Sequence, residues 1–211
     1  MSIEPAQNNL SLSKLDRNIV FFDRAIRSFI PNSNPSTRPL PVSSPDVPKL
    51  SVEEARHVAG LMRINHTGEV CAQGLYHGQA STAKQATVKK AMHQSALEEI
   101  DHLVWCETRL NELGSHPSIF SPLWYGLSFG MGAVAGLISD EFSLGFVAET
   151  ETQVSEHLHS HLGKLPAHDK RSAEILSQMD KEELHHRDKA VESGASPSRL
   201  PITTTTRYLA Q

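Results

Sequence analysis

The feature that most constrains this chain is a pair of Glu-x-x-His motifs, each preceded at long range by a single glutamate. The first motif, Glu99–His102, follows Glu69 by 30 positions, and the second, Glu183–His186, follows Glu151 by 32. A spacing of about 30 residues carries the chain from a position on one long helix to the same level on the next helix of a hairpin, so the sequence encodes the same half-site twice. A glutamate from each of two helices, with Glu-x-x-His from two others, is the ligand set of dinuclear carboxylate sites in four-helix bundles. The sequence therefore predicts a four-helix bundle around two metal ions.

Hydrophobic periodicity and stop signals place the four long helices of this bundle. Ser51, with Glu54 three positions later, forms a capping-box signature at the start of the first, and Gly114 and Pro117 end the second. The predicted helices cover residues 51–82, 85–113, 141–164 and 167–193. No stretch alternates as a strand would, so the predicted class is all-α.

Shorter segments flank the bundle. Residues 14–30 have apolar side chains at helical spacing, and a Pro/Ser-rich linker without predicted regular structure follows at 31–49. The expected organisation is an N-terminal helix and linker over 1–50, the bundle over 51–194, and a tail over 195–211 without helical period.

Helical phase selects the ligands, because Glu-x-x-His also occurs at 54–57, 156–159 and 182–185 in a chain rich in both residues. Residues three and four apart share a helix face. In the fourth helix the stripe through Glu183 and His186 is otherwise apolar, whereas the stripe through Glu182 is polar and is predicted to face solvent. The same test in the other helices gives the full inward-facing set: Glu69, Glu99, His102, Glu151, Glu183 and His186.

Burying four carboxylates without compensation would cost many kcal/mol, and two cations remove that cost. Oxygen and nitrogen donors without sulfur favour iron or manganese. His157 lies near the edge of the inward stripe of the third helix. It is predicted to orient or protonate groups at the site without binding metal, and a surface histidine is the alternative.

An uncharged apolar segment, residues 118–138, connects the two halves of the bundle. It is long enough to span a bilayer, but its glycines and serines and the acidic residues that follow argue against a true span. A segment at the membrane interface is preferred to an ordinary buried helix. Two glycine pairs, Gly126/Gly130 and Gly132/Gly136, are expected to permit close packing against a helix or lipid.

Composition excludes some classes of protein. A formal net charge of −4 and a pI near 6.3 give no electrostatic reason to expect a nucleic-acid partner. Cys71 and Cys106 both lie in helical patterns and are expected to be buried thiols in a reducing compartment. The N-terminus lacks the apolar core of a signal peptide, so secretion is not expected.

Four sequence patterns, in this order and spacing, resemble the demethoxyubiquinone hydroxylases of ubiquinone biosynthesis. They are NHTGEV at 65–70, EEIDH at 98–102, AETETQVSEHL at 148–158 and M-x-x-x-E-x-x-H at 179–186. The leader LDRNIVFFDRAIRSF is also similar. The resemblance implies a ferritin-like bundle in which the six selected residues bind two iron ions. It implies that the irons activate O2 to hydroxylate the ring of a polyprenylated demethoxybenzoquinol, and that the protein is peripheral on the cytoplasmic face of the cell membrane.

The partners implied are the quinol substrate, O2, a membrane surface, and an electron donor or other ubiquinone-biosynthesis proteins. No nucleotide site is visible, so electrons would come from a partner, a diffusing reductant or the quinone itself. Two rivals remain open from the residues alone. One is a ferritin-like protein that stores iron or detoxifies peroxide, and the other is a metal-free helical interaction module.

Overall fold

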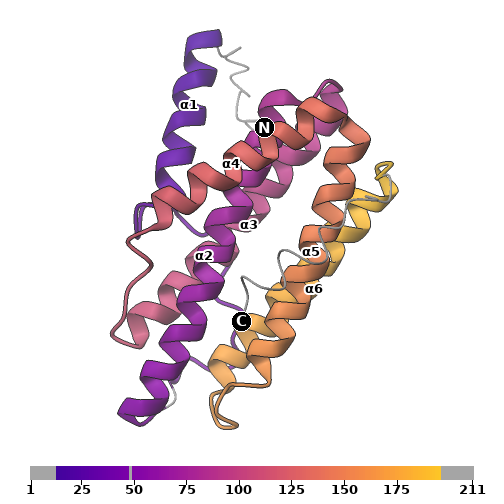
Figure 1. Cartoon of the computed structure of the whole chain (residues 1–211). Helices are drawn as coiled ribbons and strands as arrows, with labels where there is room; N and C mark the ends of the chain where they lie inside the picture. The colour runs from indigo at the N-terminus through magenta and orange to yellow at the C-terminus, as the bar shows by residue number, and fades with distance from the viewer. Residues whose placement is uncertain (1–12, 48, 196–211) are drawn as a thin grey trace, which may run out of the picture.

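The computed structural model describes residues 13–47 and 49–195, and this part of the chain is all-α, as predicted (Figure 1). It contains no strand. Its helices are α1 (Lys14–Arg27), α2 (Val52–Thr82), α3 (Ala86–Glu112), α4 (Ser121–Ile138), α5 (Asp140–Leu162) and α6 (Lys170–Glu192). The predicted tail, apart from Ala195, lies outside the described residues.

The helix ends follow the local signals. Ser51 caps α2: its hydroxyl accepts from the Glu54 amide at 3.2 Å, and its own amide donates to the Glu54 carboxylate at 2.8 Å. The four predicted bundle helices are confirmed to within three residues at each end. The helix predicted over 14–30 ends at Arg27 instead, because Pro31 disfavours helical backbone at the residue before it and Asn32 has a φ of 57°.

Two antiparallel hairpins, α2–α3 and α5–α6, form the bundle (Figure 1). Their inward stripes are buried as helical phase predicts. One apolar cluster contains Val58, Met62, Cys106, Leu158 and Met179. A second cluster contains Tyr76, Met92, Leu144, Val147 and Ala190. In every bundle helix the predicted ligands fall between residues of the first cluster and residues of the second, so apolar side chains enclose the site at both ends.

Helix α4 packs closely along α2, and glycines make this possible. A Cβ atom on Gly132 would lie 2.2 Å from the Leu75 carbonyl oxygen, and one on Gly78 of α2 would lie 2.1 Å from the Phe129 carbonyl oxygen. Gly126 and Gly130 have no such neighbour within 4 Å. Close packing against a helix is therefore confirmed for the pair Gly132/Gly136. The pair Gly126/Gly130 does not pack against a helix in this way.

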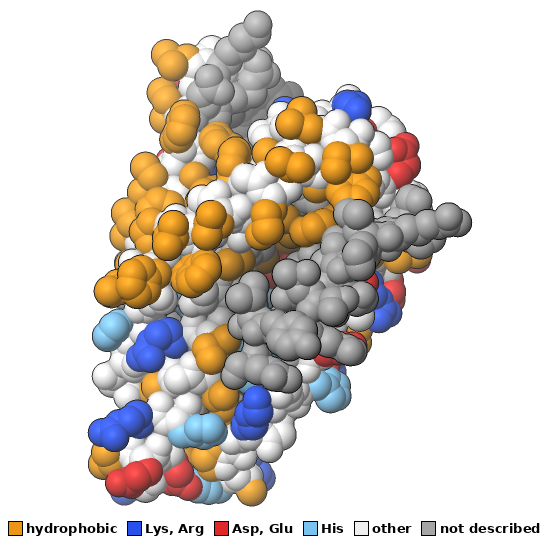
Figure 2. All heavy atoms as spheres, in the orientation of Figure 1, with side chains coloured by type: hydrophobic (Ala, Val, Ile, Leu, Met, Phe, Trp, Pro, Cys, Tyr) orange, Lys and Arg blue, Asp and Glu red, His pale blue; other side chains and the backbone are white. Residues whose placement is uncertain are grey.

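The remaining face of α4 is apolar and exposed, which rules out an ordinary buried helix for this segment. Its large exposed side chains are Leu123, Trp124, Leu127, Met131, Val134, Leu137 and Ile138. Helix α1 has a similar exposed stripe made of Leu15, Ile19, Phe22 and Ile26. Figure 2 shows these hydrophobic side chains gathered over α1 and α4 on one side of the molecule. Among the described residues, no helix combines the length and apolarity needed to cross a membrane.

The proline-rich linker has neither helix nor strand over residues 31–47, yet it is fixed to the bundle, and we call this segment the strap. Asp101 of α3 accepts hydrogen bonds from the Ser36 hydroxyl at 3.0 Å and the Thr37 amide at 2.8 Å. Farther along, the Ser43 amide donates to Glu174 of α6 at 2.8 Å. The strap therefore crosses from α3 to α6 on the outside of the site.

Candidate metal centre

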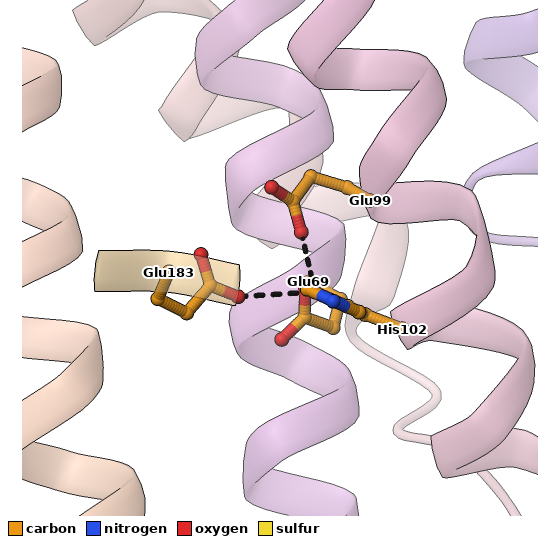
Figure 3. A group of neighbouring side chains, drawn as sticks. All are labelled: Glu69, Glu99, His102 and Glu183. Carbon is orange, nitrogen blue, oxygen red and sulfur yellow. Dashed lines mark ion pairs between the residues drawn. The ribbon is translucent and has the colours of Figure 1, made fainter. Parts of the chain in front are cut away.

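All six predicted ligands come together in the interior of the bundle, each at most 5% exposed. Glu69 comes from α2, Glu99 and His102 from α3, Glu151 from α5, and Glu183 and His186 from α6. Figure 3 shows four of them pointing toward one another, and one ligand atom from each of these four lies within 4.8 Å of the others.

Two of the carboxylates lie between the two histidines. The Nδ1 atom of His102 is 2.7 Å from a Glu99 oxygen and 3.0 Å from a Glu183 oxygen. The Nδ1 atom of His186 is 2.7 Å from the other Glu99 oxygen and 3.5 Å from the other Glu183 oxygen. Each of these carboxylates therefore presents one oxygen to each histidine, which is the arrangement a bridging ligand needs.

The two other glutamates lie at the sides of this central group. Glu69 is 3.7 Å from the His102 imidazole. Glu151 forms a hydrogen bond with Glu183 and accepts another from the Tyr76 hydroxyl. The contacts thus associate Glu69 with the His102 side, and they connect Glu151 to the cluster through Glu183.

Burial and mutual repulsion make the metal-free cluster hold protons. Burial, with the charges of Glu183 and Glu99, raises the pKa of Glu69 to about 8 and raises that of Glu151 well above its usual range. Burial alone would lower the pKa of the histidines, but the surrounding carboxylates outweigh it and raise the pKa of His186 to about 12. The same two imidazoles hold the pKa of Glu99 well below its usual value despite its burial.

The ligand atoms that face the centre of the cluster are buried and lie within ion-pair distance of one another, but none of them forms a well-aligned hydrogen bond. They are both carboxylate oxygens of Glu99, one oxygen of Glu183, and the Nδ1 atoms of His102 and His186. Buried polar atoms are normally paired, so such a group of orphaned donors is unusual. Two divalent cations would satisfy these atoms and balance the four carboxylates. The residues present therefore fit a dinuclear metal site.

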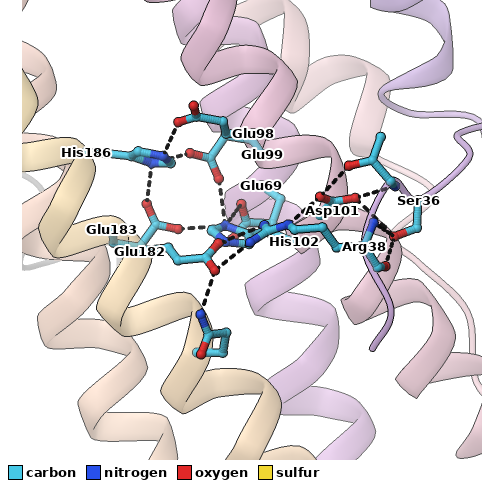
Figure 4. Close-up of polar contacts among 12 residues, drawn as sticks. Ser36, Arg38, Glu69, Glu98, Glu99, Asp101, His102, Glu182, Glu183 and His186 are labelled. Atoms are coloured by element: carbon cyan, nitrogen blue, oxygen red, sulfur yellow. Dashed lines mark hydrogen bonds and ion pairs between the residues drawn. The ribbon is translucent and has the colours of Figure 1, made fainter. Parts of the chain in front are cut away.

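The outer nitrogen of each histidine faces a glutamate on the opposite hairpin (Figure 4). His102 Nε2 lies 2.7 Å from Glu182, and His186 Nε2 lies 2.9 Å from Glu98. A carboxylate can only accept, so Nε2 donates the hydrogen. In a ring that bound metal, the Nδ1 lone pair would then be directed at the cavity between the ligands.

These outer carboxylates were missed by helical phase, and the prediction that Glu182 faces solvent was wrong. Its stripe is polar, but Glu182 reaches across to α3 instead of pointing outward. A signal was present in the chain, because both motifs read Glu-Glu-x-x-His, at 98–102 and at 182–186. The first glutamate of each motif contacts the histidine of the other.

His157 is placed beside His161, not against the ligands. The two imidazole centroids are 3.9 Å apart, and His157 Nε2 is buried without a hydrogen-bond partner. Burial lowers the pKa of His157. No hydrogen bond or ion pair links it to any of the six ligands within the described part of the chain, so its assisting role stays a prediction.

Fold and site together define an all-α bundle protein with a buried Glu/His cluster that could hold metal. Residues 56–209 match the sequence profile of the family described as ubiquinone biosynthesis protein COQ7. The chain is 68% identical over 199 residues to the 3-demethoxyubiquinol 3-hydroxylase of Psychrobacter arcticus, covering 94% of this chain and 93% of that protein. It is 57% identical over 193 residues to the enzyme of that name from Acinetobacter baumannii, covering 90% and 91%. The chain belongs to the COQ7 family.

Proposed function

We propose that this chain is a 3-demethoxyubiquinol 3-hydroxylase, a monooxygenase of ubiquinone biosynthesis that uses O2 and external electrons. The observation that carries the proposal is the convergence of six buried ligands, in a chain 68% identical to proteins of that name. The rival reading as an iron-storage or peroxide-detoxifying protein is not favoured, because the relatives carry the name of a hydroxylase. The orphaned inner donors argue against a metal-free interaction module.

The proposed cofactor is a pair of iron ions. Glu69, Glu99, His102, Glu151, Glu183 and His186 would hold them, and Glu99 and Glu183 each face both histidines. When bound, iron supplies the activation of O2 that no side chain can provide. The protein supplies orientation and a dry environment. The Tyr76 hydroxyl fixes Glu151 by donating to it, and the two apolar clusters exclude water from both ends of the site.

The substrate would be a polyprenylated quinol, which resides in a lipid bilayer, so the enzyme needs a surface that contacts lipid. The exposed stripes of α1 and α4 provide it (Figure 2). Large exposed apolar patches are uncommon on soluble proteins unless the patch binds a protein, a membrane or a ligand. We assign them to the bilayer surface, with the protein peripheral on the cytoplasmic face of the cell membrane.

A flotation experiment with liposomes tests this surface. The double variant Trp124→Ser and Leu127→Ser removes two exposed side chains from α4, and burial of each is worth about 1.5–3 kcal/mol. Binding to liposomes should fall by at least about 100-fold. The control is Val52→Ser with Ile64→Ser, two apolar residues of α2 that are 70% and 52% exposed, against 41% and 53% for Trp124 and Leu127. Equal binding by the two double variants would contradict the assignment.

Quinone profiling tests the reaction itself. A strain that lacks this gene should accumulate the quinone one ring hydroxyl short of the product, and the wild-type chain should remove that intermediate. The Glu183→Gln variant should not, because its amide is a poor substitute for a carboxylate that faces both histidines. Normal quinone composition in the deletion strain would refute the proposed activity.

A further inference from the structure

The two histidines of the centre are supported unequally. On one side, Glu182 accepts two hydrogen bonds from the Arg38 guanidinium, at 2.7 and 2.8 Å, while it contacts His102. On the other side, Glu98 contacts His186 and, among the described residues, accepts hydrogen bonds from Lys189 at 3.2 Å and from Gln94 at 3.0 Å. Arg38 and Lys189 are about equally exposed, at 42% and 44%, while Glu182 is 19% and Glu98 30% exposed. The two sides therefore differ in hydrogen-bond geometry more than in solvent screening.

Arg38 belongs to the strap and is itself fixed by α3. Its Nε atom donates to Asp101 at 2.6 Å, and its guanidinium lies 4.7 Å from the ring centroid of Trp105. Trp105 in turn packs against the His102 imidazole, with the centroids 5.4 Å apart. The strap backbone holds Asp101 in place through Thr37. Arg38 thus joins α3 to α6 directly outside His102 (Figure 4).

We propose that Arg38 is a positioning residue that makes the His102 side the tighter of the two metal positions. This role rests on the proposed metal centre. It goes beyond that centre because the two ligand sets contain the same residue types and do not themselves make one position tighter. A two-pronged arginine–carboxylate contact fixes both distance and orientation, whereas a lysine supplies only a point charge. Glu182 is therefore held in one orientation, and it holds the His102 ring in turn. Glu98 has more freedom, so the His186 ring is less constrained.

An anaerobic titration of the metal-free chain with Co²⁺, followed by its visible absorption, and with Fe²⁺, followed by calorimetry, tests this. The wild-type chain should bind two equivalents in two steps of unequal affinity. Loss of a partner that orients a ligand typically weakens metal binding by about 10- to 100-fold. Arg38→Gln should weaken the tighter step by about 10-fold and leave the weaker one unchanged, whereas Arg38→Lys should fall between.

Two controls separate this role from anchoring of the strap. Glu174→Gln removes the carboxylate that receives Ser43, so it loosens the strap without touching Glu182. It should leave both steps unchanged. Lys189→Gln should affect only the weaker step. Circular dichroism of each metal-free variant confirms that the helices remain.

The outcomes distinguish the two levels of the proposal. If the wild-type chain binds no metal, the proposed metal centre fails. If it binds two equivalents and Arg38→Gln changes neither step, or weakens both equally, the positioning role is refuted while the centre stands. If Glu174→Gln reproduces the effect of Arg38→Gln, the strap acts only as a general anchor and the role of Arg38 is again refuted.

Discussion

The contact between α2 and α4 leads to a sharp prediction about Gly132. A Cβ atom there would lie 2.2 Å from the Leu75 carbonyl oxygen and 3.1 Å from the Gln79 amide nitrogen. Carbon and oxygen atoms in contact normally lie about 3.3 Å or more apart. The obstacle is helix backbone, which cannot rotate away as a side chain can. In Gly132→Ala the two helices must therefore separate by roughly 1 Å.

Overpacking of this kind costs about 1–3 kcal/mol, and a backbone obstacle places the variant at the upper end. In a chain of this size each kcal/mol corresponds to about 2–4 °C in Tm, so Gly132→Ala should lower Tm by about 6–12 °C. Gly130, two residues away on the same helix, has nothing within 4 Å of its ideal Cβ. Gly130→Ala should raise the free energy of unfolding by about 0.5–1 kcal/mol, since alanine loses less backbone entropy on folding.

Thermal unfolding of both variants, followed by circular dichroism at 222 nm (roughly the helix minimum), measures the difference. The same substitution on the same helix should change Tm in opposite directions. If Gly132→Ala leaves Tm unchanged, or if Gly130→Ala lowers it as much, close backbone contact does not control this interface.

Three further outcomes are expected. Glu183→Ala, supplied with iron, should lose hydroxylation while keeping its helical circular dichroism spectrum, and turnover comparable to wild type would refute the ligand assignment. Metal uptake near pH 7 should release protons and tighten as pH rises, because the metal-free cluster raises the pKa of Glu69 to about 8 and that of His186 to about 12. Calorimetry in buffers of different ionisation enthalpy measures this release. Burial lowers the pKa of His77 from 6.5 to about 4, so only the unfolded chain takes up this proton between those values. The free energy of unfolding should fall by about 2–3 kcal/mol as pH falls through that window, and less in His77→Gln, as acid-dependent urea unfolding would show.

The burial of the six candidate ligands in one cluster could be predicted from the sequence, because two independent patterns agree on these residues. The repeated spacing selects Glu99 and Glu183, and helical phase places both in apolar stripes that must be buried. Neither pattern depends on how loops are folded. The outcome is a set of six residues that the structure brings together without exception.

The contacts of Glu182 with His102 and Arg38 could not be predicted in this way, for a physical reason. Helical phase predicts which face of a helix is polar, but it does not predict which side chains of other segments pack against that face. The strap has no period, so its path from Asp101 to Glu174 is fixed by individual hydrogen bonds that composition cannot forecast. The apolar stripe on α1 shows the same limit, because periodicity predicts an apolar face but not whether protein covers it.

Glu98 contacts His186 and Glu182 contacts His102, so each hairpin supplies the outer partner of the other hairpin's histidine. Reciprocal contacts of this kind, in which each hairpin contributes a glutamate to the other's histidine, are typical of twofold, self-complementary pairing. A hairpin separated from the other would lose the carboxylate that contacts its histidine. The strap contributes to one side alone, which is something that a symmetric pair of hairpins cannot supply.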